Sequence, residues 1–181
     1  TLARRVFLVL TGLPPTPAEL AAFTADRAPD AYERLVDRLL TEEPYRTRHA
    51  EHFAQPWLDA ARYADTSGIH MDAGRQIWPW RDWLLASLRD DLPFDRFVID
   101  QIAGDLVPNA TIDQHTASGF LRLHVTTDEG GAIDEEYRVE YAAERTATVG
   151  SVMLGLTVGC ARCHDHKYDP IRQEDFYRLF S

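Results

Sequence analysis

The sequence has 181 residues, a formal net charge of −10 at pH 7 and a pI of about 5.1. Its hydrophobic content of 45% and charged content of 27% are those of an ordinary globular protein, and its length suits one domain. An acidic surface repels phosphate backbones, which argues against nucleic acid as a partner. No apolar stretch approaches the roughly 20 residues that cross a bilayer, so we expect no membrane span in this segment.

The N-terminal part has the periodicity of amphipathic helices. Residues 2–10 crowd apolar side chains onto one face and end at a Gly-Leu-Pro-Pro turn. Thr16 and Glu19 form a Thr-x-x-Glu capping box, which predicts that the next helix covers 18–25. Apolar residues at helical spacing predict further helices over 30–40 and 45–63.

The remainder continues this pattern with longer polar connections. The polar and glycine-containing residues 65–74 predict a loop, and 126–131 is turn-like. No segment alternates with the period of two that marks a half-buried strand. The sequence therefore predicts an all-α fold, a single mainly helical domain with long polar loops over residues 1–181. The further helices are expected over 78–88, 93–103, 115–124, 134–156 and 173–180, with a loop over 104–110. On the helix over 134–156 we expect Tyr137 and Tyr141 to face inward, and Glu140 and Glu144 to form ion pairs with Arg138 and Arg145 of the same helix.

The ends of the chain suggest a longer protein. The first residue is not Met, and the last residues lie inside an apparent helix. We therefore expect residues 1–181 to be an excerpt of a multidomain protein, so the absence of a signal peptide says nothing about localisation.

Residues 160–164 read Cys-Ala-Arg-Cys-His, and Cys160 and Cys163 are the only cysteines in the chain. This C-x-x-C-H spacing is the attachment signature of a c-type haem, in which two thiols add to the haem vinyl groups and the histidine binds iron. The motif predicts one covalent haem c with His164 as the proximal iron ligand. Because bacterial attachment takes place outside the inner membrane, it also predicts a periplasmic or otherwise extracytoplasmic location.

Three other interpretations of the cysteines stay open. In the first, the two cysteines form a redox disulfide of the C-x-x-C type, although no βαβ pattern surrounds them. In the second, they bind structural zinc together with His164 and His166, although the two-residue spacing of the histidines is awkward. Inert core thiols are disfavoured, because Arg162, His164 and Asp165 around them are polar.

The sixth iron ligand decides between electron transfer and small-molecule chemistry. His124 follows an apolar helix, Met153 lies on the helix that leads into the motif, and His70 lies in the predicted loop. Each also has a simpler role, as a core methionine or as a surface or capping histidine. The sequence does not choose among the three.

Polar residues around the motif suit a haem environment. Arg162 and Lys167 are expected to bind the haem propionates, and Asp165 or Asp169 to orient a histidine. The alternative is a simple polar turn before Pro170.

A second polar cluster surrounds the Gly-Gly pair at 130–131. Asp128, Glu129, Glu135 and Glu136 would bind a hard cation or supply acid–base groups to a substrate pocket. The alternative is that they stabilise the positive end of the helix dipole at the start of the helix over 134–156.

Several motifs together resemble one family, the planctomycete-type cytochrome-c-associated family. The resemblance covers essentially the whole chain, and its most specific block runs from Gly155 to Pro170, through C-x-x-C-H-D-H-K-x-D-P. Relatives often have histidine where this chain has Pro56, so any role of that histidine does not transfer. The other matching blocks are residues 5–8, 11–17, 57–65, 81–83, 93–97 and 104–106.

The family is a domain of unknown function, and the resemblance implies a large secreted protein with further domains and a link to carbohydrate or sulfated-polysaccharide metabolism. Our leading hypothesis is a haem domain for extracytoplasmic electron transfer to a redox partner protein or a neighbouring domain of the same chain. The second is a haem-dependent oxidase- or peroxidase-like domain. The third is a non-redox module with structural zinc or a carbohydrate-binding role. No substrate or oligomeric state follows from the sequence.

Overall fold

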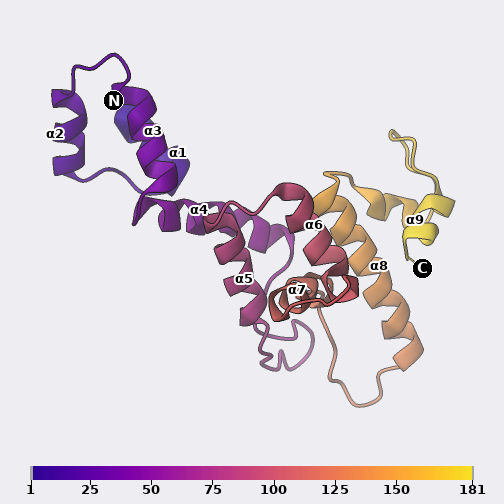
Figure 1. The fold of residues 1–181 in the computed structure, drawn as a ribbon. Helices are drawn as coiled ribbons and strands as arrows, with labels where there is room; N and C mark the ends of the chain where they lie inside the picture. Colours follow the sequence, from indigo (N-terminus) through magenta and orange to yellow (C-terminus); the bar gives the residue numbers. More distant parts are fainter. Residues whose placement is uncertain (1, 181) are drawn as a thin grey trace. The chain divides into compact units, whose positions relative to one another are not determined.

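Turn and capping signals set the limits of many helices in the structure, a computed structural model that describes residues 2–180 (Figure 1). The prediction of a mainly helical fold is confirmed. Thr16 and Glu19 form the expected capping box with both reciprocal hydrogen bonds. The α-helices are α1 (Leu2–Thr11), α2 (Pro17–Ala25), α3 (Ala31–Thr41), α4 (Tyr45–Ala60), α5 (Trp78–Arg89), α6 (Phe94–Ala103), α7 (Ile112–Ala117), α8 (Asp134–Met153) and α9 (Gln173–Phe180). Short 3₁₀ helices are η1 (Gly104–Leu106), η2 (Ser118–Arg122) and η3 (Val158–Arg162).

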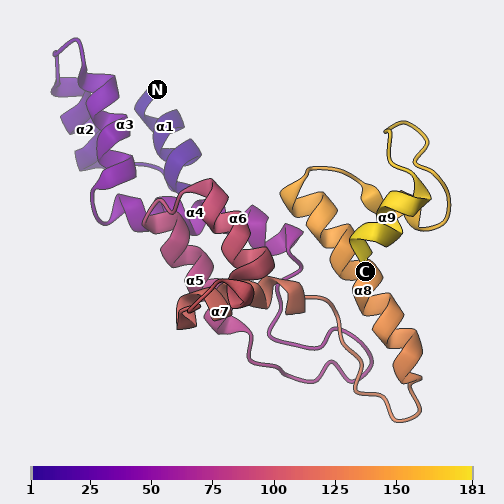
Figure 2. The same cartoon turned by 45° about the vertical axis from the view of Figure 1, so that its right-hand side comes forward.

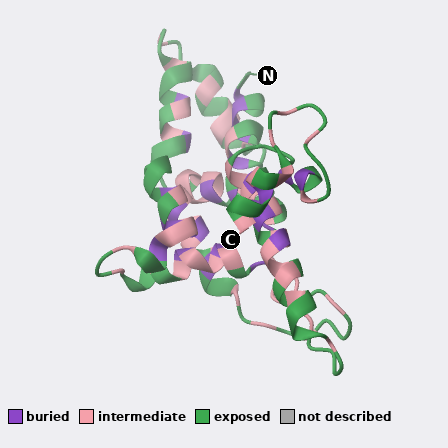
Figure 3. Cartoon of the chain, turned by 90° about the vertical axis from the view of Figure 1, so that its right-hand side faces the viewer, coloured by how far each residue is buried: buried purple, intermediate pink, exposed green. Residues whose placement is uncertain are grey.

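Within residues 2–180, β-pairing is limited to isolated bridges. Thr66 pairs with Gly74 across the loop between α4 and α5, and Gly68 pairs with Thr126 in the loop before α8. The connecting loops are largely exposed or half-buried (Figure 3). No helix in this part of the chain is long and apolar enough to cross a membrane.

By its contacts the chain divides into two compact units. The first contains residues 2–55 and Leu84–Leu92, and α1 and α3 form most of its core. Phe7, Leu39 and Leu84 are its largest fully buried side chains, and half-buried residues of α2 pack against the cluster that contains Phe7 and Leu39.

The second unit contains Pro56–Trp83 and residues 93–180. Here Phe97 lies between two tryptophans, with ring centroids 5.0 Å from Trp57 and 5.5 Å from Trp83. The fully buried Gln101 accepts a hydrogen bond from Trp57 Nε1 (3.3 Å) and donates one to the Phe97 carbonyl (3.1 Å). A buried amide with both ends paired avoids the large desolvation penalty of an unpaired polar group.

In the same unit α8 and α9 lie side by side, and η3 packs against both (Figures 1 and 2). Their shared core contains Ala143, Val158, Ala161 and Phe176. A Cβ atom built on Gly150 would lie 2.3 Å from Val158 Cγ2, so only glycine allows η3 to approach α8 this closely.

The structure corrects some expected helix limits. The helix expected over 115–124 starts earlier, because Thr111 and Gln114 form a second capping box, and it is divided into α7 and η2. Gly104 begins a 3₁₀ turn where a loop was expected. On α8 the large side chains expected to face inward, such as Tyr137 and Tyr141, are only half-buried, and the buried positions are small residues.

Candidate functional site

The Cys-Ala-Arg-Cys-His segment begins within η3 and presents three distinct faces. Since a 3₁₀ helix has three residues per turn, residues three apart lie above one another. Val158 and Ala161 form the buried face against α8 and α9. Cys160 and Cys163 are both exposed, unpaired thiols on a second face. The two cysteines therefore point away from the core on the same side of one turn.

His164 follows the turn directly, and its ring has a defined hydrogen bond. Its Nδ1 lies 2.7 Å from the carbonyl oxygen of Asp165. A carbonyl oxygen only accepts hydrogen bonds, so Nδ1 carries the proton in this contact and Nε2 of the neutral ring is left with a lone pair. The expected partner was a carboxylate, but Asp165 supplies its backbone carbonyl, and its side chain instead accepts from the Gln173 amide (2.8 Å).

Arg162 fixes the turn to both neighbouring helices. Its guanidinium donates two hydrogen bonds to Glu140 on α8, one of them at 2.9 Å. Its carbonyl accepts from Gln173 Nε2 (3.0 Å) and Tyr177 Oη (3.1 Å) on α9. Hydrogen bonding from Arg162 lowers the pKa of Glu140. Arg162, expected to bind a haem propionate, is thus occupied by a carboxylate of the protein itself.

Lys167, the other residue expected to bind a propionate, lies on the polar loop after the turn. Its Nζ lies 5.2 Å from the ring centroid of Tyr168, which is itself 82% exposed. This placement leaves the ammonium group on the surface.

His166 is held quite differently from His164. The backbone amides of Tyr168 and Asp169 point at its Nδ1, at 3.3 and 2.9 Å. A ring nitrogen that accepts hydrogen bonds carries no proton, so the nearby Asp169 carboxylate (3.3 Å) does not form an ion pair with it. His166 therefore shapes this loop. Within residues 2–180 no three His, Cys, Asp or Glu side chains form a group that could hold a metal ion.

The three candidate sixth ligands lie in different places. His124 is half-buried, stacks on Tyr141 at 4.6 Å and contacts the carbonyl of Val125 (2.9 Å). Burial lowers its pKa. Met153 ends α8 and is half-buried. His70 lies in the loop before α5, 2.7 Å from Glu129.

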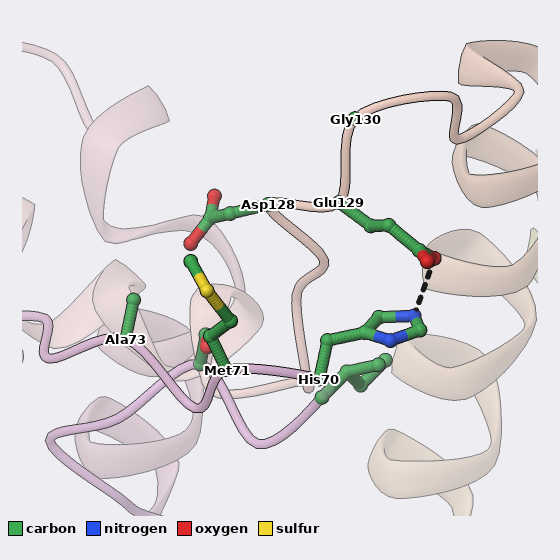
Figure 4. Close-up of a pocket in the computed structure, with 8 residues that line it drawn as sticks. His70, Met71, Ala73, Asp128, Glu129 and Gly130 are labelled. Atoms are coloured by element: carbon green, nitrogen blue, oxygen red, sulfur yellow. Dashed lines mark ion pairs between the residues drawn. The ribbon is translucent and has the colours of Figure 1, made fainter.

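The acidic residues around Gly130 do not act as one cluster. Asp128 and Glu129 line a pocket of about 390 Å³ together with His70 and Met71, where Met71 points toward Asp128 and His70 pairs with Glu129 (Figure 4). Glu135 and Glu136 lie in the first turn of α8, where acidic side chains favour the helix dipole. Glu135 pairs with Arg138, which lowers its pKa.

The third face of η3 borders a groove along α8. Gly159 and Arg162 line it, and its volume is about 480 Å³. The cysteines are not among its lining residues, and neither are the three candidate sixth ligands. The groove also contains Arg62, which pairs with Glu144 on α8. Sequence reasoning missed this site: Glu140 and Glu144 were expected to pair with nearby arginines of α8, but their partners come from distant segments.

Comparison with known proteins gives a family without an activity. No curated protein matches the sequence, and no solved structure matches it. The model of one family, described as PSCyt2, protein of unknown function (DUF1549), matches residues 1–181. Since the match covers the whole length, the chain belongs to this PSCyt2 family of proteins of unknown function.

Proposed function

We propose that this chain is a c-type haem-binding domain that transfers electrons outside the cytoplasm. One observation carries the proposal: two unpaired cysteines, the only ones in the sequence, lie exposed on one side of a single turn, directly before an exposed histidine. Two accessible thiols beside an imidazole with an available Nε2 are the groups that covalent haem requires.

In this proposal Cys160 and Cys163 would hold the haem through thioether bonds, and His164 Nε2 would bind the iron. The bound haem would supply one-electron redox chemistry. The carbonyl of Asp165 orients the imidazole and increases its basicity through the Nδ1 hydrogen bond. Arg162, held by α8 and α9, keeps the turn in place. The redox partner would be another protein or a neighbouring domain of a longer chain.

The attachment chemistry also implies a compartment. Haem is joined to C-x-x-C-H thiols outside the inner membrane in bacteria, so the proposal includes a periplasmic or secreted location. The test is expression of the chain behind a secretory signal in a bacterium with a cytochrome c maturation system. We expect an intact mass raised by one haem, retained after denaturation, and a c-type pyridine haemochrome spectrum.

Matched variants make this test specific. Cys160→Ser and Cys163→Ser should each remove one thioether bond, and the double variant should lose covalent haem. His115→Ala changes an exposed histidine outside the turn and should keep it. Absence of haem, in cells that mature a reference cytochrome normally, would refute the proposal.

Two other results would point to the alternatives. Zinc found by elemental analysis, and lost in the double cysteine variant, would identify a structural metal site. A spectral change on adding cyanide to the ferric haem protein would reveal an open iron position, as an oxidase- or peroxidase-like domain requires.

A further inference from the structure

The groove along α8 has the composition of a binding site for an uncharged, hydroxyl-rich ligand. Its floor is a single stripe of α8, because Tyr137, Glu140, Tyr141 and Glu144 follow the i, i+3, i+4, i+7 spacing of one helix face. The walls come from the loop after α4, the segment before α8, η3 and α9. Five separate segments thus converge on one concave surface.

Two ion pairs supply the polar groups of the groove. Arg62 pairs with Glu144, and Arg162 pairs with Glu140 one helical turn away. The side chains of Arg62 and Glu140 are 43% and 48% exposed, so part of each group faces solvent. A carboxylate has about four acceptor positions and a guanidinium has five N–H donors, so each pair retains unused donors and acceptors.

The balance of these charges indicates the class of ligand. Each guanidinium in the groove is matched by a carboxylate, so the surface has no surplus of positive charge for a sulfate or phosphate group. Sugar hydroxyl groups donate and accept hydrogen bonds at once, and adjacent donors and acceptors satisfy both functions. The groove is therefore suited to a neutral ligand.

Tyr137 and Tyr141 provide the aromatic rings along the floor of the groove, and aliphatic side chains such as Ile69 and Val125 also line it. The ring centroids of Tyr137 and Tyr141 lie 5.6 Å apart. Tyr141 is fixed, because it stacks on His124 and its Oη accepts a hydrogen bond from the Thr127 amide (2.7 Å). A ring that is already ordered loses little conformational entropy when a ligand packs against it.

We infer that this groove binds a neutral saccharide, whose ring faces pack on Tyr137 and Tyr141 while its hydroxyl groups bond to the two ion pairs. The inference depends on the groove alone and holds with or without bound haem. If no saccharide bound, the proposed haem function would be unaffected. If no haem were attached, the proposed saccharide site would be unaffected.

Calorimetric titration of the purified chain tests this inference. The neutral probes are cellohexaose, mannohexaose and xylohexaose, and the anionic probe is a sulfated carrageenan hexasaccharide. We expect at least one neutral probe to bind with a Kd below about 1 mM, and the sulfated probe to bind more weakly. Binding of none of the neutral probes, or tighter binding of the sulfated probe, would overturn the inference.

Substitutions then locate the binding. Tyr137→Ala and Glu140→Gln should each weaken binding by about tenfold, whereas Tyr168→Ala, at an exposed tyrosine outside the groove, should have no effect. Tyr137→Leu, which keeps an apolar side chain, serves if Tyr137→Ala does not fold. Affinity that is unchanged in folded variants at both positions would show that the saccharide binds elsewhere.

Discussion

At the scale of single residues, Arg162 connects the turn that carries Cys160 and Cys163 to the rest of its unit. Its side chain pairs with α8 and its carbonyl accepts two hydrogen bonds from α9. Bidentate pairing with a carboxylate fixes a guanidinium in orientation as well as position. Arg162, one of the two residues between the cysteines, is therefore anchored, and this holds the thiols on the neighbouring face in a defined direction.

His124 should make stability depend on pH. Burial lowers its pKa below the usual 6.5, and the nearby Arg145 acts in the same direction. The unfolded chain therefore takes up this proton at a higher pH than the folded chain does. The contribution of neutral His124 to the free energy of unfolding is therefore fully present above pH 6.5. It is lost as the pH falls from 6.5 toward the pKa of His124 in the folded protein.

Denaturant unfolding between pH 7.5 and 5 measures this effect. The free energy of unfolding should rise with pH over this range, and the contribution of His124 to that slope corresponds to the uptake of at most one proton. We expect His124→Asn to remove this contribution. The same exchange at the exposed His115 is the matched control and should leave that component in place. An identical pH slope in wild type and His124→Asn would contradict the assignment.

At the scale of elements, the contact of η3 with α8 depends on the absence of a side chain at Gly150. Gly150 lies in the interior of α8, where alanine would ordinarily favour the helix by about 1 kcal/mol. Here the added Cβ would meet Val158 at 2.3 Å. We expect Gly150→Ala to lower the free energy of unfolding by about 1–3 kcal/mol, the usual effect of overpacking.

Two further variants isolate the contact. Gly159→Ala adds the same methyl group where its nearest neighbour is Ala147 Cβ at 3.6 Å, an ordinary contact, so its effect should be small. Val158→Ala, introduced into Gly150→Ala, should recover part of the lost stability, a coupling that a double-mutant cycle measures. A Gly150→Ala protein as stable as wild type would show that η3 moves away at no cost.

Local signals in the sequence predicted the helices well. The capping box of Thr16 and Glu19 is a short-range pattern, and α2 begins where it indicates. The second box at Thr111 and Gln114 has the same logic with glutamine, and recognising it would have given the correct start of α7. The prediction that large residues occupy the buried face of α8 was wrong, because the close approach of η3 leaves room only for small residues there.

The candidate site, too, was predictable from the sequence only where its residues lie close together in the chain. Cys160, Cys163 and His164 lie within five residues of the chain, so their spacing alone predicts a haem-attachment chemistry, which stays a prediction. The groove was not predictable, because Arg62 and Arg162 are brought to α8 by the fold and no local pattern pairs them with Glu144 and Glu140. Contacts between residues far apart in sequence require the tertiary structure.

At the scale of the whole molecule, the dominant property is negative charge. The sequence has 29 acidic residues against 19 lysines and arginines, which gives the net charge of −10. A protein with this charge attracts cationic reagents and repels anionic ones, and added salt screens both effects. Under the proposed function, the field should therefore act on electron transfer.

We expect the ferrous haem protein to be oxidised by reagents of opposite charge with opposite dependence on salt. Oxidation by cationic tris(1,10-phenanthroline)cobalt(III) should slow as ionic strength rises from about 10 mM to about 100 mM, because the screening length falls from about 30 Å to about 10 Å. Oxidation by anionic ferricyanide should accelerate over the same range. Stopped-flow absorbance of the haem measures both rates. If salt changed both rates in the same direction, the net charge would not control the encounter, and the local charges around the exposed turn would have to be examined instead.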